Sequence, residues 1–219
     1  MTEERRAIMD NADASDGMTD EAGRAFARRG VTAVDGTMKA RIERAALELF
    51  TARGVDGVSI KELAAEAGVS VGALYRHYES KEALALALFD TIHGRLHDEV
   101  KAALEAGGTF ETVARRVVRA YCEAADADRS LFAYHLTHMV RFTNAPSPRP
   151  DPVALIAARI EAAMDARDIP RGDPEIKAAA ALGVVLQPAI HRLAGRFDAP
   201  LADRADELAR AALAVLRSR

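Results

Sequence analysis

Residues 60–78, IKELAAEAGVSVGALYRHY, decide the fold of this chain. Apolar residues recur from Ile60 to Ala67 at the i, i+3, i+4, i+7 spacing of one buried helical face. Gly68 stands where a left-handed helix end is needed, and Ser70 is a preferred N-cap for a second helix. The stretch therefore predicts two short helices joined by a turn, which is the layout of a DNA-binding helix-turn-helix.

The second helix has a predicted inner and outer side. Leu74 and Tyr78 lie four residues apart and continue the core. Small residues at 72 and 73 allow the backbone of this helix to approach another surface closely. The outer side is expected to carry Ser70, Ala73, Arg76 and His77, with Tyr75 at its edge.

Signals on both sides make the motif more specific. Upstream, residues 37–53 predict one amphipathic helix, with Gly54 as its stop and Ser59 as the cap of the next helix. Downstream, Ser80 caps a new helix whose first turn contains Lys81. A helix ending in LF-x-x-x-G, then the turn motif, then LYRHYESKEAL resembles the N-terminal domain of the TetR (tetracycline repressor) family over residues 37–90.

The resemblance implies an all-α fold of about nine helices in two domains. A disordered tail is expected at 1–36, a three-helix DNA-binding domain at 37–84, and a helical effector-binding and dimerisation domain at 85–219. It also implies ten DNA-contacting residues. Contacts to phosphates are expected from Ser59, Lys61, Tyr75, His77 and Lys81, contacts in the groove from Ser70, Val71, Gly72 and Ala73, and a contact to a guanine edge or a phosphate from Arg76. The alternatives are plain helix packing for Tyr75 and a surface histidine without a ligand for His77.

Composition agrees with a helical protein that folds in a reducing compartment. Of 219 residues 49% are hydrophobic, and there is no Trp. No stretch approaches the ~20 apolar residues of a membrane span, and the N-terminus lacks a secretory apolar segment. The single Cys122 excludes an internal disulfide and lies between apolar neighbours, so we expect an inert buried thiol and a cytoplasmic protein without a membrane partner.

Charge argues against tight non-specific DNA binding. The chain has 30 Lys and Arg against 33 Asp and Glu, a net charge of −3. Residues 37–81 hold seven basic and six acidic residues, a net of +1. Phosphate contacts need few correctly placed cations, so the balance does not exclude a DNA site.

The first 36 residues carry eight acidic and five basic residues with little apolar periodicity, which predicts a disordered tail. The alternative is an N-terminal arm on the minor groove, carried by the basic patch at 24–29. Met18 and Met38 are alternative start positions.

Beyond residue 88 the sequence predicts helices without a chemical motif. A proline-rich loop is expected at 146–152, and Pro188 is expected to kink or split its helix. The predicted helices span 81 to about 104, 110–125, 129–142, 152–167, 174–195 and 201–217.

The last two helices are the predicted homodimer interface. One carries a heptad-like seam, and the other a stripe of mostly small residues. In the family that the chain resembles, this pair from each subunit forms a four-helix bundle, which lets a dimer read a palindromic operator. The alternative is that both helices close the core of the monomer. The seam is Leu201, Ala205, Leu208, Ala212 and Val215, and the stripe is Ile176, Ala179, Ala180, Gly183 and Ile190.

The resemblance further implies a repressor that an unidentified small molecule releases from double-stranded DNA. Aromatic, Met and His residues at helical spacing are candidates for its pocket, with ordinary core as the alternative. The candidates are Phe89, His93, Phe132, Tyr134, His135, Met139, Phe142 and Met164.

Other function classes find little support. His93 and His97, and His135 and His138, have spacings that can hold a metal, but no acidic or Cys partner is fixed nearby in sequence. There is no P-loop, dinucleotide fingerprint or nucleophile elbow. We therefore expect no enzyme, cofactor or metal. The alternative function is a constitutive DNA-binding dimer without effector sensing.

Overall fold

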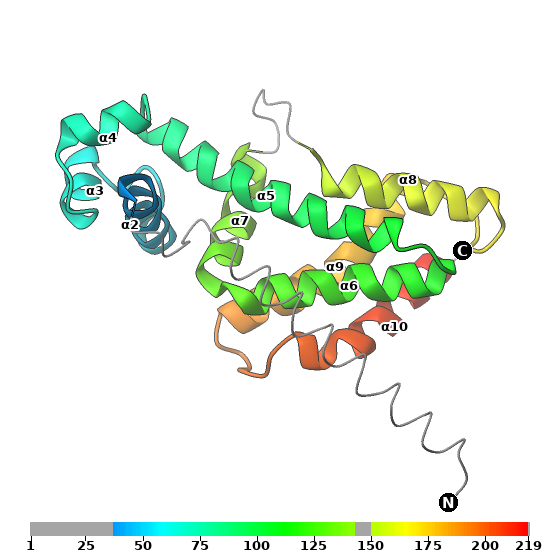
Figure 1. The fold of residues 1–219 in the computed structure, drawn as a ribbon. Helices are drawn as coiled ribbons and strands as arrows, with labels where there is room; N and C mark the ends of the chain where they lie inside the picture. The colour runs from blue at the N-terminus through cyan, green and yellow to red at the C-terminus, as the bar shows by residue number, and fades with distance from the viewer. Residues whose placement is uncertain (1–36, 143–149, 219) are drawn as a thin grey trace, which may run out of the picture.

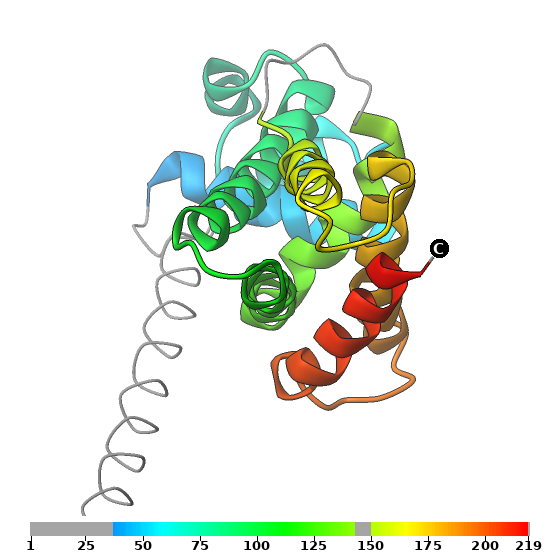
Figure 2. The same ribbon diagram turned by 90° about the vertical axis from the view of Figure 1, so that its right-hand side faces the viewer.

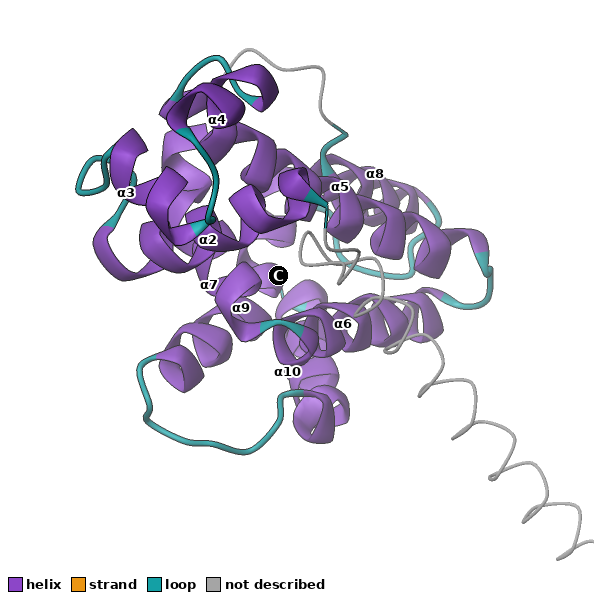
Figure 3. Ribbon diagram, turned by 60° about the vertical axis from the view of Figure 1, so that its left-hand side comes forward, coloured by secondary structure: helices purple, strands orange, loops and turns teal. Residues whose placement is uncertain are grey.

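The computed structural model describes residues 37–142 and 150–218. Within these ranges the chain forms nine α-helices and one short 3-10 helix, with no strand (Figures 1 and 3). The predicted all-α fold is confirmed. The predicted tail at 1–36, and most of the predicted proline-rich loop, lie outside the described residues.

The helices begin and end close to the predicted positions. The order along the chain is α2 (Met38–Arg53), α3 (Ile60–Glu66), α4 (Val71–His77), α5 (Lys81–Glu105), α6 (Phe110–Ala127), α7 (Arg129–Phe142), α8 (Pro152–Asp165), α9 (Pro174–Leu193), the 3-10 helix η1 (Ala202–Arg204) and α10 (Ala205–Arg217).

Helices α2, α3 and α4 form a compact unit at one end of the molecule (Figure 1). Its core holds the fully buried Ile42, Phe50, Leu63 and Leu74. Side-chain caps define the helix starts, because an oxygen that accepts an orphan amide fixes the first turn. The predicted caps Ser59, Ser70 and Ser80 each accept the backbone amide three residues on, and Thr37 caps α2 in the same way.

Helix α5 connects this unit to the rest of the chain. Its 25 residues span about 37 Å at ~1.5 Å per residue. The helix packs against α6, α7 and α8. Figure 2 looks nearly along α5, α6 and α8, with α9 and α10 to one side of them. A shift of α5 along or about its axis would therefore reach both ends of the molecule.

Asp126 at the end of α6 ties α9 and α10 to the body. Its carboxylate pairs with Arg192 and accepts the backbone amides of Leu201 and Ala202 at 3.1 and 2.8 Å. Because the guanidinium is buried, this pairing satisfies a charge that would otherwise be costly.

Two expectations for the last helices need correction. Helix α9 is not split at Pro188, because one helix runs from Pro174 to Leu193. Three of the five seam residues face their own chain, since Leu201, Ala205 and Ala212 are at most 2% exposed and α10 packs on α6 and α9. The other two, Leu208 and Val215, are half-buried. The stripe on α9, by contrast, is exposed along its whole length, from Ile176 to Ile190.

None of the described helices is long and apolar enough to cross a membrane.

Candidate DNA-binding face and effector cavity

Helix α4 presents one continuous face to solvent, which we call the α4 face: Ser70, Val71, Gly72, Tyr75, Arg76 and His77. All six residues are exposed, with Val71 at 37% and Tyr75 at 50%. A Cβ added at Gly72 would meet nothing within 4 Å, so the backbone there is open to a partner. An exposed valine and a half-exposed tyrosine on one short helix favour contact with a partner surface.

Ala73 does not belong to this face. It is 4% exposed and packs inward beside Leu74. The prediction that Ala73 lies on the outer side of the helix is therefore wrong. A single methyl group gives no signal of which side of a seven-residue helix it occupies.

Helix α3 begins with a capping box at Ser59. The Ser59 hydroxyl accepts the Glu62 amide at 3.2 Å, and the Glu62 carboxylate accepts the Ser59 amide at 2.8 Å. These hydrogen bonds to Ser59, together with Arg53, lower the pKa of Glu62 to about 2. The backbone amide of Ser59 is thus occupied, which leaves its hydroxyl as the group able to reach a phosphate.

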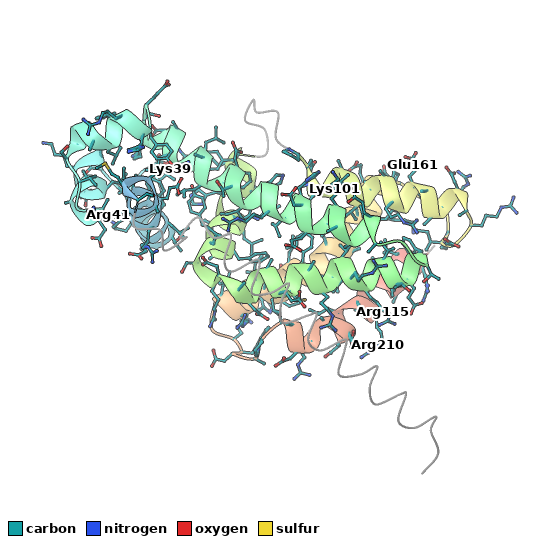
Figure 4. The ribbon with its side chains drawn as sticks, in the orientation of Figure 1. Lys39, Arg41, Lys101, Arg115, Glu161 and Arg210 are labelled. Atoms are coloured by element: carbon teal, nitrogen blue, oxygen red, sulfur yellow. The ribbon has the colours of Figure 1, made fainter. Side chains whose placement is uncertain are left out.

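Arg41 on α2 fixes the turn between α3 and α4 (Figure 4). Its Nη2 donates to the carbonyl oxygens of Ala67 and Gly68, both at 2.6 Å. Gly68 has φ +62°, and a Cβ there would lie 2.6 Å from the same nitrogen. The turn therefore needs glycine for its backbone angle and for space. The sequence motif located the turn but not the arginine 26 residues upstream that holds it.

Most cations of the three-helix unit are already engaged. Arg53 pairs with Glu62 at 2.9 Å, and Lys39 lies 3.7 Å from Glu43. Lys61 and Arg76, in contrast, are exposed and make no hydrogen bond or ion pair with the described residues. These two side chains have their full charge available for phosphates.

Lys81, a predicted phosphate contact, already makes one hydrogen bond within the chain. Its Nζ donates to the Val58 carbonyl oxygen at 3.0 Å, and the residue is half-buried. The ammonium has three donors, so two remain for a phosphate. The bond also ties the start of α5 to the loop before α3.

Tyr78, at the end of α4, contributes to the position of the α4 face. Its hydroxyl donates to Glu43 on α2 at 2.5 Å. Burial and this carboxylate raise the pKa of Tyr78 above its ordinary value, so the phenol keeps its proton. The helical pattern identified Tyr78 as core, but no sequence signal indicated the partner 35 residues away.

Helix α7 connects the body directly to the three-helix unit. Arg141 donates two hydrogen bonds to Asp56, at 2.9 and 3.2 Å, in the loop between α2 and α3. This bidentate contact lowers the pKa of Asp56. The Tyr134 hydroxyl donates to the Ala85 carbonyl at 2.8 Å, and its ring stacks on Phe50 of α2. Helices α2, α5 and α7 are therefore mechanically linked.

Six of the eight predicted effector residues form a packed cluster between α5 and α7. The ring of Phe89 lies 5.0–5.4 Å from its neighbours in this cluster, and His93 Nδ1 lies 3.1 Å from His135 Nε2. The members are Phe89, His93, Phe132, Tyr134, His135 and Phe142, all buried. Met139 packs on the core as a half-buried residue, and Met164 lies on α8 beside a separate surface hollow.

Burial dominates the electrostatics of this cluster. His135 is 4% exposed, and burial, with the neighbouring His93, lowers its pKa to about 3. Its Nδ1 has no hydrogen-bond partner among the described residues. No group of three or more His, Cys, Asp or Glu residues there or elsewhere in residues 37–142 and 150–218 is arranged to hold a metal ion.

An apolar cavity lies instead between α6, α8, α9 and α10. Its volume is about 50 Å³, more than the ~10–15 Å³ that one water molecule needs. None of the predicted effector residues lines it. Its walls are Leu104, Phe110, Val113, Ala114, Val117, Val118, Tyr121, Ile156, Arg159, Ile160, Ala181, Leu182, Val185, Ala212 and Leu216.

Known proteins resemble the two parts of the chain to different degrees. Residues 42–88 match the family model described as bacterial regulatory proteins, tetR family. The transcriptional repressor KstR2 of Rhodococcus jostii (strain RHA1) is 32% identical over 108 residues, which cover 45% of this chain and 51% of KstR2. The chain thus spans about half the length of this curated relative.

Solved structures resemble the fold over most of the chain. A putative fatty acid metabolism regulator of Clostridium perfringens superposes with a TM-score of 0.71 at 17% identity, covering 82% of this chain and all of that one. The regulator FadR of Bacillus subtilis, solved in complex with stearoyl-CoA, gives 0.65 at 13% identity over 80% of this chain and 97% of that one. At these identities the comparison establishes the fold.

The chain thus joins a helix-turn-helix unit by one long helix to an all-helical body. Its residues 42–88 are a helix-turn-helix domain of the TetR family, and its fold is that of solved bacterial regulators.

Proposed function

We propose that this protein is a cytoplasmic, homodimeric transcriptional repressor that binds a palindromic operator and is released by a small molecule. The observation that carries DNA binding is the α4 face, together with the exposed Lys61 on α3. Exposed cations without a partner among the described residues, next to an exposed tyrosine and a bare glycine backbone, provide charge for phosphates and a surface for close approach to bases.

In this proposal, some residues contact phosphates and others contact bases. Lys61, Arg76 and the hydroxyls of Ser59 and Tyr75 position the protein on phosphates. Val71 and Gly72 lie against base edges, where an apolar side chain suits a thymine methyl group. Because few polar groups read bases, much of the sequence preference comes from the shape of the DNA.

Dimerisation is supported by the exposed stripe on α9. Ile176 is 68% exposed and Ile190 is 43% exposed, at the two ends of a face lined by Ala179, Ala180 and Gly183. Small residues between larger apolar ones let a second helix approach closely. An exposed apolar face of this length favours burial against an identical copy. A dimer then places two α4 faces on one side of the duplex.

Release by a ligand requires that the two conformations bind it with different affinity. The cavity touches Leu104 at the far end of α5, and the near end of α5 follows α4 directly. The Arg141–Asp56 ion pair makes a second connection, between α7 and the three-helix unit. A ligand that moves α6 and α8 apart thus also shifts α5 and α7, which are both connected to the three-helix unit. FadR of Bacillus subtilis, which binds stearoyl-CoA, has the same fold.

The alternative is a constitutive DNA-binding dimer without effector sensing. The cavity favours the ligand-responsive function over this alternative. A dimer that holds its operator in the presence of every ligand that fills the cavity would support the alternative.

The test is selection of bound duplexes from a random pool, followed by sequencing. The wild type is expected to enrich a palindrome with half-sites about one helical turn apart. A Tyr75→Ala, Arg76→Ala double variant is expected to enrich none. Weak binding without a consensus, equal in both proteins, would refute the proposal.

A further inference from the structure

The chemistry of the cavity narrows the class of ligand, an inference that rests on the proposed function. The surface that the lining residues present to the cavity is wholly apolar. Such a cavity gives water no hydrogen-bond partner, so an apolar ligand gains free energy by entering it. A ligand whose polar groups must be buried there is excluded, because each unpaired group costs free energy.

Among the described residues that line the cavity, one is charged. Arg159 on α8 is half-buried, and its guanidinium carbon lies 5.2 Å from the centroid of the Phe110 ring. Since the cavity surface is apolar, Arg159 contributes its methylene stem to the wall and holds its charge outside it. No carboxylate of the described chain pairs with this guanidinium.

Two other arginines, unlike Arg159, have a carboxylate partner. Arg115 and Arg217 both bind Glu111, at 2.8 and 2.7 Å. The Glu111 carboxylate is therefore taken by two other cations, while Arg159 at the cavity contacts an aromatic ring. A guanidinium in this position is suited to a carboxylate or phosphate of a ligand.

The lining of the cavity extends along α6. On α6 its lining runs from Phe110 to Tyr121, about 16 Å at ~1.5 Å per residue. That length matches roughly a dozen carbon–carbon bonds of ~1.5 Å each. We propose that the cavity binds an anionic amphiphile, with a linear apolar chain between α6, α8, α9 and α10 and its acidic head group on Arg159.

The test is calorimetric titration of the full-length protein, without DNA, with decanoate and with the uncharged 1-decanol. Decanoate is expected to bind the wild type. It is expected to bind Arg159→Gln at least tenfold more weakly. Arg159→Lys is expected to restore most of the affinity. Binding of 1-decanol should change less than twofold among these proteins. The charge-matched control is Arg171→Gln, whose side chain is exposed and lies outside the cavity.

A variant that fills the cavity tests where the apolar chain of the ligand binds. Ala114 is half-buried and lines the cavity, so Ala114→Leu is expected to weaken decanoate and 1-decanol alike while the thermal unfolding midpoint is kept. The inference is overturned if the wild type does not bind decanoate, or if Arg159→Gln or Ala114→Leu binds it as tightly. Decanoate that binds as expected but leaves the selected duplex bound would instead count against ligand release in the proposed function.

Discussion

Burial of His135 predicts a specific dependence of stability on pH. Burial and the neighbouring His93 lower the pKa of His135 to about 3, from an ordinary value of about 6.5. Below pH 6.5 the unfolded chain takes up a proton at this residue and the folded chain does not. The stability is therefore complete above pH 6.5 and is lost progressively as the pH falls toward 3.

The magnitude follows from the two pKa values. Each pH unit between them costs about 1.4 kcal/mol, so the free energy of unfolding should fall by about 2 kcal/mol between pH 7 and pH 5 because of His135 alone. No carboxylate of the described residues contacts the ring: it faces His93, Phe89 and Phe132, and Asp151 lies 3.9 Å from the far nitrogen of His93. Protonation thus places a charge beside a second imidazole.

The assay is urea unfolding followed by circular dichroism at pH 7, 6 and 5, at one protein concentration because a dimer unfolds with mass action. Carboxylates with lowered pKa values, such as Glu62, also stabilise the folded protein. Their contribution to the free energy of unfolding is lost at still lower pH, and it is lost in every variant. The difference between wild type and His135→Phe therefore isolates His135. The variant should lose about 2 kcal/mol less, while the exposed His77→Gln should behave as the wild type. Equal pH dependence in wild type and His135→Phe would refute the reasoning.

Three further outcomes are expected. Gly68→Ala should destabilise the protein by about 1–2 kcal/mol in the same unfolding assay, because its φ is positive, whereas Gly72→Ala in open space should be neutral or stabilising; equal effects would contradict the account of the turn. Ile190→Asp should sediment as a monomer at micromolar concentration, while Val140→Asp, an equally apolar residue that is 89% exposed on α7, should remain a dimer. Cys122 is fully buried, and burial raises the pKa of its thiol to about 12, so Ellman's reagent should modify it in urea but not in the folded protein; rapid modification of folded protein would refute this.

Local signals in the sequence were sufficient to predict the elements of the fold. Capping residues such as Ser70 and Ser80, and breaks such as Gly68, act over three or four residues, so their effect is visible in a single sequence. The exposed side chains of Tyr75 and Arg76 follow from the same helical period. Contacts over long separations were not predictable, because Arg41 reaches Gly68 only after α2 packs on the turn.

The cavity that we propose for the effector could not be placed from the sequence, for a different physical reason. Val113 and Val117 have the spacing of any buried helical face, and so do the residues of the packed cluster around Phe89. Whether facing side chains fill the space between helices depends on the sum of their volumes in three dimensions. The prediction rested on aromatic residues, and the structure packs these large side chains against one another around Phe89.

The heptad-like seam illustrates the same limit. Leu201 and Ala212 recur at a spacing that suits either a partner helix or the chain's own α6 and α9. The choice between them depends on where the preceding loop directs α10, and Asp126 holds that loop in place from another helix.

DNA binding by the α4 face and Lys61 is tested by titrating the selected duplex, followed by fluorescence anisotropy, over a range of salt concentrations. A Lys61→Gln, Arg76→Gln double variant removes two cations that have no partner among the described residues. It is expected to bind at least tenfold more weakly at physiological salt and to show a shallower salt dependence, by about one unit for each phosphate that is no longer neutralised. Arg171→Gln should match the wild type. Equal affinity and equal salt dependence in all three proteins would show that Lys61 and Arg76 do not contact DNA.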